Sequence, residues 1–252
     1  MTIDIPLNPD KTIFRDLIIK VKAYYEAYYI TQCSRTDPAI NTCLQKTGNR
    51  LARLLKNGVP ELGIEEVEPV VVDEIGISLG AGPDGYRAVF KDIQAFGVSN
   101  LTVTGVRSDV ESLQFQLTLE IPKISVQAQY RSSGVLILVR ASGAGDYWGE
   151  YEGVKTKVYF RAAPLRVSDD GNTILKVEQV KMDFSVRDIK MGVDNVANGN
   201  TILQAALNLF INSNAQELLR EMKPALRTKL AALMASFMNR LFEKVPLEHW
   251  LD

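Results

Sequence analysis

Few side chains in this sequence have the types and spacing that catalysis or metal binding requires. The 252 residues include one histidine, His249, and two cysteines, Cys33 and Cys43, which are too few for a structural zinc site. His249 and Glu248 could act as a general base, but no Gly-x-Ser-x-Gly elbow or reactive-cysteine motif accompanies them. A packing or exposed histidine is the simpler interpretation. We therefore expect no catalytic residue, no metal site and no cofactor.

The glycine-rich and charged stretches do not indicate a phosphate or nucleic-acid site. Residues 80–85 are rich in glycine but lack the spacing and the lysine of a phosphate-binding loop, so they predict a hairpin turn. The chain has 29 Lys and Arg residues against 30 Asp and Glu residues, a formal net charge of −1. This balance lacks the positive field that nucleic acids require. No stretch has the 18 or more uncharged apolar residues of a membrane span, so we expect no integral membrane association.

The two cysteines lie ten positions apart near one end of the chain. In a reducing compartment such a pair is usually two separate thiols, whereas in a secreted chain it is a local disulfide. The spacing alone leaves both open. Charged residues such as Arg15 and Lys20 interrupt what would be the apolar core of a signal peptide. The chain is therefore either intracellular or the mature form of a secreted protein.

The largest region that could position a site has the period of β-strands and runs from residue 70 to residue 193. In residues 113–121 the odd positions are apolar and the even ones are polar, but after Pro122 the apolar positions become even. The same slip recurs between Val186 and Ile189. A slip of one residue turns the inner face outward unless the strand bulges or turns there. Long strands with bulges curl, so we predict a strongly curved antiparallel sheet.

Helical periodicity precedes and follows this region. Residues 12–30 predict an amphipathic helix, and residues 38–57 predict a second one with Asp37 as its N-cap. Residues 201–212 and 214–242 predict two more, the last about 43 Å long if its internal proline only kinks it. Its wide apolar stripe needs a partner that surrounds it, and only the curved sheet is large enough. We predict an α+β fold in which a long C-terminal helix is wrapped by this sheet.

Several motifs follow one another in an order that is typical of one protein family. They are Cys33 to Leu44, Leu55 to Ile64, Glu68-Pro69, Phe96 to Leu101, Leu119 to Pro122, Gln129-Tyr130, Gly134 to Leu138, Asn208 to Asn214, Lys223-Pro224 and Phe242 to Pro246. In these motifs the chain resembles the insect takeout and haemolymph juvenile-hormone-binding protein family over roughly residues 30–251. The resemblance implies a secreted, non-enzymatic carrier with a fold similar to one repeat of the tubular lipid-binding (TULIP) superfamily. It also implies a hydrophobic tunnel between the long helix and the sheet, which holds one lipophilic ligand.

The resemblance sharpens two features at the N-terminal end. It implies a disulfide between Cys33 and Cys43, which would hold the start of the second helix beside the ligand entrance. It also divides the chain into a family-like domain, residues 33–252, and an additional helical segment, residues 1–32. That segment would plug or lengthen one end of the tunnel, or form contacts with a second copy or a receptor, and the sequence does not choose between these roles.

The candidate ligand-binding residues are the apolar side chains that face inward in the predicted elements. Each is also consistent with plain core packing, since a tunnel and a core use the same residue types. For Tyr130 the family resemblance implies a hydrogen bond to a polar group of the ligand, although its hydroxyl would equally suit a backbone carbonyl or water. The candidates are Leu44, Phe90, Phe96, Phe115, Leu117, Tyr130, Leu136, Leu138, Trp148, Phe160, Met182, Phe184, Leu226, Leu230 and Phe237.

Two surface features complete the prediction. Tyr147 and Trp148 lie between glycines and are predicted to occupy a turn, where they cap the end of the barrel or gate ligand entry. Asn100 begins the one complete Asn-x-Ser/Thr sequon and is a candidate glycosylation site.

We expect an extracellular carrier for one elongated hydrophobic small molecule, such as a terpenoid hormone, fatty acid, quinone or pigment. The alternative is a ligand-free interaction protein that docks a receptor or a second copy through its N-terminal helix.

Overall fold

The computed structural model describes residues 30–60, 66–79, 85–136, 139–140, 142–167, 171–194 and 201–252. The helix predicted over residues 12–30 lies outside these residues except for its last position. The described elements are, in chain order, α2 (Ile40–Leu54), β1 (Val70–Leu79), β2 (Tyr86–Phe96), η2 (Val98–Asn100), β3 (Thr102–Asp109), β4 (Gln114–Ser133), β5 (Val135–Leu136), β6 (Val139–Arg140), β7 (Gly143–Val167), β8 (Thr173–Ser185), β9 (Asp188–Asp194), α3 (Thr201–Ser213), α4 (Ala215–Lys244) and η4 (Leu247–His249).

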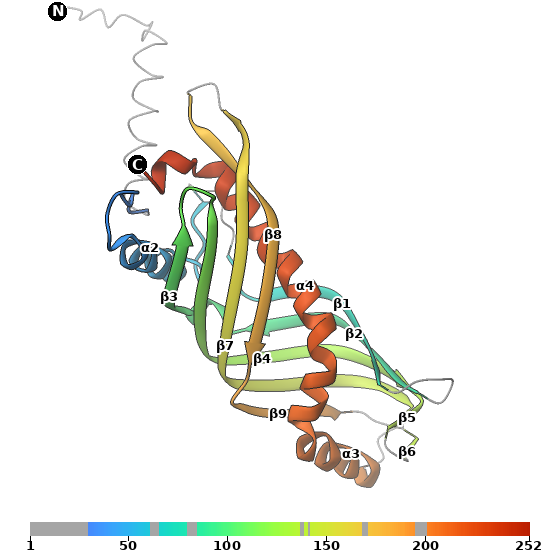
Figure 1. The fold of residues 1–252 in the computed structure, drawn as a ribbon. Coiled ribbons are helices and arrows are strands. Elements are labelled where there is room, and N and C mark those ends of the chain that lie inside the picture. The colour runs from blue at the N-terminus through green and yellow to red at the C-terminus, as the bar shows by residue number, and fades with distance from the viewer. Residues whose placement is uncertain are drawn as a thin grey trace, which may run out of the picture.

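One curved antiparallel sheet dominates the described part of the chain. Its strand order is β1-β2-β4-β7-β8, with β3 also paired to β4 and β9 also paired to β7. β4 and β7 run through both halves of the sheet; one half contains β3 and β8, and the other contains β1, β2 and β9. Figure 1 shows the sheet bent between these halves, with α4 against the inside of the curve. The predicted α+β fold, with a long C-terminal helix wrapped by the sheet, is confirmed.

The bend lies where the strand periodicity slips. The pairing of β4 with β7 skips Pro122 and Gly153, and β8 gives way to β9 on either side of Arg187. The Arg187 N–H donates to the Glu152 carbonyl (3.0 Å), which keeps the chain attached to β7 through the corner. Gly153 has a φ of +62°, a conformation that favours glycine. Both predicted slips in periodicity therefore lie at the bend of the sheet, beside the same part of β7.

α3 and α4 agree with the predicted helices to within two residues at each end, whereas α2 is shorter than predicted. α4 has 30 residues, a length of about 45 Å, and contains Pro224 in its interior. α2 begins at Ile40, two residues later than predicted, and it ends three residues earlier, at Leu54. Its N-cap is Ala39 rather than Asp37, because the Asp37 carboxylate accepts the N–H of Ala39 (2.7 Å) in the turn that precedes the helix.

Two large apolar clusters lie between α4 and the sheet, one toward each end. The α2-end cluster contains a stacked pair, Phe115 and Phe160 (4.9 Å between ring centroids), with Phe242 of α4 beside it. The α3-end cluster contains Tyr130 and Tyr147. The buried members of the first are Cys33, Leu113, Phe160, Ala162, Leu175, Val177, Met238, Phe242, Leu247 and Leu251, and those of the second are Val72, Ile93, Ala128, Tyr130, Tyr147, Met191, Val193 and Ala215. Smaller clusters lie under α2 and beside β3.

Side-chain amides from two helices pair with edge strands of the sheet. On β3, the Val103 N–H donates to the side-chain oxygen of Asn49 (2.8 Å), and the Asn49 amide donates to the Val103 carbonyl (2.8 Å). Asn208 of α3 makes the same two bonds with Val193 of β9 (2.8 and 3.0 Å). A planar side-chain amide offers both N–H donors and a carbonyl acceptor, so it can pair with one edge residue as the backbone of a neighbouring strand would.

The edge of β8 is held by α4 in a similar way. Asn239 accepts the Val177 N–H (2.8 Å), and Arg227 donates to the Met182 carbonyl (2.8 Å). Lys223 adds an ion pair with a β8 carboxylate (2.8 Å). These contacts align α4 with β8. On the opposite edge of the sheet, β1 has no such side-chain pairing among the described residues.

Glu68 connects two of the motifs that the sequence singled out. Its carboxylate accepts hydrogen bonds from the Gly97 N–H (3.0 Å), the Ser99 N–H (2.7 Å) and the Ser99 hydroxyl (2.5 Å). It therefore fixes the η2 turn between β2 and β3. Burial alone would raise the pKa of Glu68, but these hydrogen bonds outweigh burial and lower it.

We expect this turn to weaken in acid. Because the pKa of Glu68 is lower in the folded state, its contribution to the free energy of unfolding is present above the unfolded pKa of about 4.3 and is lost as the pH falls through the folded pKa. Glu68→Gln should therefore be less stable than the wild type at neutral pH, and the difference should shrink toward about pH 3. Urea unfolding followed by circular dichroism measures this. Glu66→Gln, at an exposed neighbour, is the control; an equal loss at both pH values for Glu68→Gln would contradict the assignment.

Candidate functional site: the concave face of the sheet

The concave face consists of the sheet side chains that point toward α4. The strand register places seven of the predicted ligand-binding residues there. Phe90 lies opposite Tyr130, Phe115 opposite Phe160, and Met182 and Phe184 lie on β8 beside the inward positions of β7. These residues share a face because they alternate with polar side chains that point to solvent. The seven are Phe90, Phe115, Leu117, Tyr130, Phe160, Met182 and Phe184.

The helical candidates meet the same face. Phe237 of α4 and Leu44 of α2 pack against the α2-end cluster. Leu226 and Leu230 lie on the stripe of α4 that also carries Leu233, which packs against the α3-end cluster. Residues three and four apart share one side of a helix, so this whole stripe is directed at the sheet.

Phe96 and Trp148 lie on the outer face, contrary to the prediction. β2 bulges between Lys91 and Gln94, which reverses the side-chain parity, so Phe90 points inward and Phe96 outward. Trp148 lies opposite Gly192 of β9 and covers it, since a Cβ at Gly192 would come within 2.8 Å of the indole ring. Neither residue can line a space beside α4.

Two candidates remain without a described side chain. Leu136 belongs to β5, which pairs with the short β6, and Leu138 lies outside the described residues.

Packing along the concave face is uneven. The residues near both ends of α4 belong to buried clusters. Phe184, Leu226 and Leu230 are instead partly exposed, and none of them is packed into the four apolar clusters of the described residues. The Phe184 ring lies beside the Lys223 ammonium group, 5.5 Å from the ring centroid. Partly exposed apolar side chains that face the interior provide a surface that a hydrophobic molecule can cover. This middle stretch of the concave face is the candidate binding site.

Tyr130 provides a polar group at the α3 end of this face. Its side chain is only 5% exposed, and its hydroxyl forms no hydrogen bond with any residue that the structure describes. The ring packs over Gly145, where a Cβ would come within 3.3 Å of it. Burial raises the pKa of Tyr130, and the nearby Tyr86 and Asp194 raise it further. The hydroxyl is therefore a neutral donor that is available to a polar atom within the apolar site.

Tyr147 and Tyr151 form a pair of inward hydroxyls that the sequence did not predict. The prediction of a turn at Tyr147 and Trp148 is wrong, because both lie within β7. Tyr147 packs edge-on against Phe90 (5.0 Å between centroids), and its hydroxyl bonds with that of Tyr151 and with the sulfur of Met191 (3.5 Å). Burial raises the pKa of Tyr147 well above its usual value. Gly145 and Gly149, which flank Tyr147 and Trp148, suggested a turn and masked the period-two signal.

The inward rows around these tyrosines carry no charge. Tyr130, Tyr147 and Tyr151 lie beside apolar residues and glycine on β2, β4 and β9. Within the described ranges, no three acidic, histidine or cysteine side chains converge where they could hold a metal ion. No helix of these ranges is long and apolar enough to cross a membrane.

The outer surface carries the remaining features. Asn100 is exposed at the end of the η2 turn. A pocket of 280 Å³ opens on the side of the sheet away from α4, lined by Gly105, Val106, Arg107, Gln116, Thr118 and Lys157. Its polar lining differs in character from the concave face.

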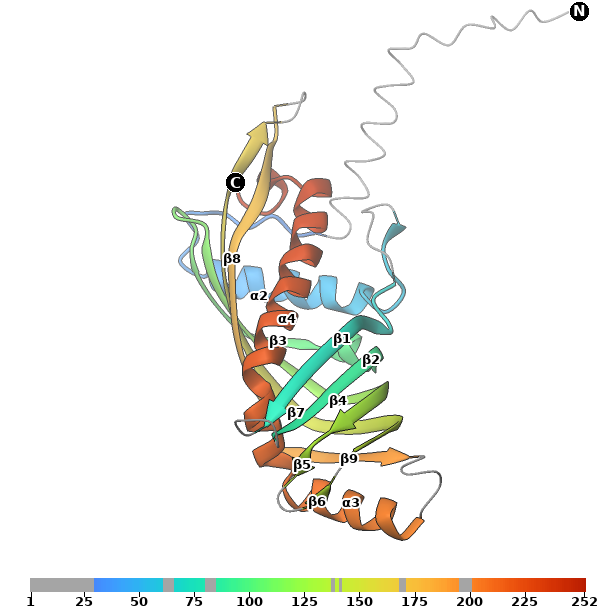
Figure 2. The ribbon, with the colours of Figure 1, turned by 90° about the vertical axis from the view of Figure 1, so that its right-hand side faces the viewer.

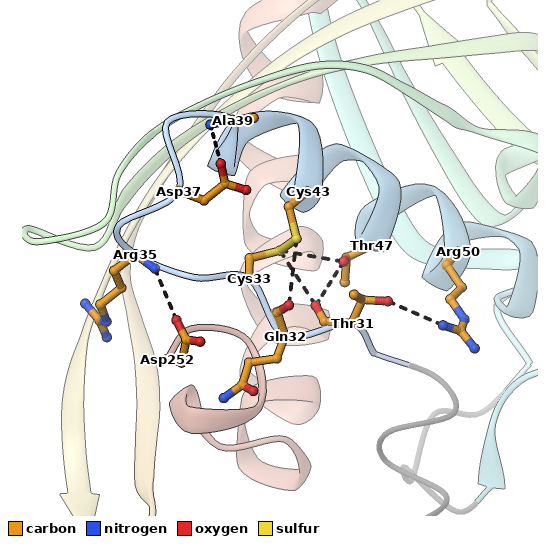
Figure 3. Close-up of a disulfide and its surroundings, with 10 residues drawn as sticks. All are labelled: Thr31, Gln32, Cys33, Arg35, Asp37, Ala39, Cys43, Thr47, Arg50 and Asp252. Atoms are coloured by element: carbon orange, nitrogen blue, oxygen red, sulfur yellow. Dashed lines mark hydrogen bonds between the residues drawn. A yellow bond between two sulfur atoms is a disulfide. The ribbon is translucent and has the colours of Figure 1, made fainter.

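A disulfide between Cys33 and Cys43 secures the α2 end, as the family resemblance implied. Figure 3 shows the bond between the first described segment and α2. The Cys33 N–H donates to the Trp250 carbonyl (2.9 Å), and the Asp252 N–H donates to the Cys33 carbonyl (3.3 Å). Thr47 of α2 adds a bond to a neighbouring carbonyl (3.0 Å). The disulfide thus joins the start of the domain to α2, and the backbone bonds of Cys33 attach the C-terminal residues.

Loss of this disulfide should loosen the α2 end. The bond closes a loop of about eleven residues, so Cys33→Ser/Cys43→Ser should lower the free energy of unfolding by about 3 kcal/mol. Hydrogen exchange should increase first in α2 and in the C-terminal residues. Differential scanning calorimetry and exchange mass spectrometry, with the reduced wild type as a matched sample, measure both effects. Unchanged melting and unchanged protection of α2 would rule out this role.

Comparison with known proteins gives three consistent matches. The family model for haemolymph juvenile hormone binding protein matches residues 17–252. The circadian clock-controlled protein daywake of Drosophila melanogaster is 22% identical over 230 residues, which cover 88% of this chain and 87% of that protein. Daywake of Drosophila yakuba is 20% identical over 216 residues and 83% of each chain.

The fold also matches a solved structure. Takeout 1 of Epiphyas postvittana superposes with a TM-score of 0.77 at 16% identity, covering 88% of this chain and all of that one. The family match begins inside the segment 1–32 that the sequence analysis set apart, and the division at residue 32 stays a prediction.

Proposed function

Because the chain belongs to the haemolymph juvenile hormone binding protein family, we propose that it carries one elongated hydrophobic molecule between α4 and the concave face of its sheet. The family is one of binding proteins rather than enzymes. In this proposal the protein works outside the cell, shields its ligand from water and performs no covalent chemistry.

The observation that supports the proposal is the partly exposed apolar middle of the concave face. Phe184 on β8, and Leu226 and Leu230 on the stripe of α4 that faces the sheet, are outside the buried clusters and remain partly exposed. Covering such surface contributes about 25 cal/mol per Å². A ligand that buries a few hundred Å² would therefore bind at about micromolar concentration or tighter after the cost of association.

In this proposal Tyr130 sets the orientation of the ligand. A ligand with an oxygen atom at one end can accept a hydrogen bond from the buried hydroxyl, while its apolar body lies along the middle of the face. A carboxylate would meet no cation in the rows around Tyr130, and burying an unpaired charge is costly. For a ligand whose polar end lies at Tyr130, this favours terpenoid esters and quinones over ionised fatty acids.

We propose that the ligand enters and leaves where α4 lies against β1. α4 is fixed to β8 by side-chain hydrogen bonds and an ion pair, whereas no side-chain pairing of that kind reaches β1 among the described residues. A small movement of α4 away from β1 would open the site without breaking the bonds to β8.

Two features support an extracellular location. The Cys33–Cys43 disulfide suits an oxidising compartment, and the exposed Asn100 sequon is open to glycosylation.

Native mass spectrometry and solvent extraction of the purified protein test the carrier directly. We expect a bound lipophile, and Leu226→Gln/Leu230→Gln should lower the affinity for it at least about tenfold by placing polar groups in the apolar site. Leu165→Gln is the matched control, because Leu165 is 57% exposed and lies on the β7–β8 hairpin. An empty protein that binds no lipophile would instead support the ligand-free interaction protein, for which removal of residues 1–30 would abolish self-association or receptor binding.

Tyr130→Phe tests the polar contact. Loss of one hydrogen bond should weaken a ligand that carries a carbonyl or ester oxygen about two- to tenfold, and it should leave the matching hydrocarbon unaffected. Isothermal titration with both compounds measures the difference. Since the hydroxyl has no partner among the described residues, the variant should be as stable as the wild type. An equal loss for both compounds would contradict a role in hydrogen bonding.

A further inference from the structure

α3 departs from the usual polarity of a surface helix, because both its inner and its outer side carry apolar residues. Its amides, Asn208 and Asn212, face the protein, where Asn212 binds both the N–H (3.1 Å) and the carbonyl (2.7 Å) of Met191 in β9. Leu207 and Ile211 of the same side pack against the α3-end cluster. A helix at a protein surface normally turns its apolar side inward and its polar side to solvent. Here the side-chain amides point inward because they form hydrogen bonds with the edge strand β9.

The opposite side of α3 is apolar and exposed. Ile202 is 83% exposed and Leu209 is 71% exposed, the highest values among the large hydrophobic residues that the structure describes. Ala205 and Ala206 lie between them and are also exposed. Residues 201–213 contain no charged side chain. The outer side of the helix is therefore a continuous aliphatic strip without charge.

The position of α3 leaves this strip accessible. Figure 2 shows α3 beyond β9 at the end of the molecule, where it crosses the direction of α4. The two amide-bearing turns hold it against β9, so the aliphatic strip faces away from the sheet. This arrangement presents the side of a helix, rather than its end, to an approaching surface.

We propose that α3 docks this end of the protein onto the surface of a lipid bilayer, with Ile202 and Leu209 entering the interface. A bilayer needs no complementary shape, whereas a stable protein interface needs about 800 Å² per partner, more than a strip of four aliphatic side chains provides. Since the strip has no charge, the docking depends on apolar contact and takes place on electrically neutral lipid.

Docking through α3 would also bring the site close to a source of ligand. The inner side of the helix packs against the cluster that contains Phe90 and Tyr130, so the bilayer and this end of the concave face lie on opposite sides of one helix. The inference goes beyond the proposed function and does not depend on it, because docking can be measured with protein that has been stripped of ligand.

The test is flotation of the full-length, ligand-stripped protein with vesicles of phosphatidylcholine. The wild type should float with the vesicles equally well at low and high salt, and Ile202→Gln/Leu209→Gln should lower the partition coefficient at least tenfold. Leu165→Gln/Val167→Gln is the matched control, since these residues are 57% and 66% exposed on the β7–β8 hairpin. It should float like the wild type. Circular dichroism and urea unfolding confirm that both variants are folded.

Three results would overturn the inference. The first is absence of wild-type flotation with phosphatidylcholine, including the case in which flotation appears only with anionic lipid and disappears in salt. The second is an equal loss in the control variant. The third is a concentration-dependent dimer in light scattering that the α3 variant abolishes while its vesicle binding is unchanged, which would assign the strip to a second copy of the chain. Retained or lost ligand binding has no bearing on these outcomes, so a failure here is distinguishable from a failure of the carrier function.

Discussion

The architecture depends on satisfying the backbone hydrogen-bonding groups at the edges of a sheet that does not close on itself. Unpaired edge groups attract other chains or must be covered. Here Asn49, Asn208 and Asn212 each contribute a donor and an acceptor to one residue of an edge strand, and Asn239 accepts from a third edge. The helices thus take the place of neighbouring strands, which fixes where they lie.

This edge pairing helps to hold α4 along the inside of the curved sheet. α4 is aligned by polar contacts with β8, so its position does not rely on complete packing of its apolar stripe. Both ends of the stripe join buried clusters, while Leu226 and Leu230 keep part of their surface exposed. Under the proposed function, a bound ligand would cover this remaining apolar surface.

The same constraint accounts for the unusual surface of α3. Residues four apart lie on one side of a helix, so Asn208 and Asn212 can both reach β9 only if that side faces the sheet. Leu207 and Ile211 share that side and pack against the α3-end cluster, whereas Ile202 and Leu209 point outward. In most surface helices such residues would be covered. Here the hydrogen bonds of the two amides hold α3 on β9 although these residues are exposed.

Sequence patterns determined the local features of this protein. The period-two alternation, its slips near Pro122 and Val186, and the long apolar stripe of residues 214–242 were enough to predict a curved sheet around a helix, because these signals depend on neighbours along the chain. The motifs added the family and, through it, the disulfide. Only the tertiary structure decided that a bulge turns Phe96 outward, that Tyr147 faces inward, and which asparagines pair with which strand. These outcomes depend on register and on contacts between residues far apart in sequence, and periodicity within one segment does not contain that information.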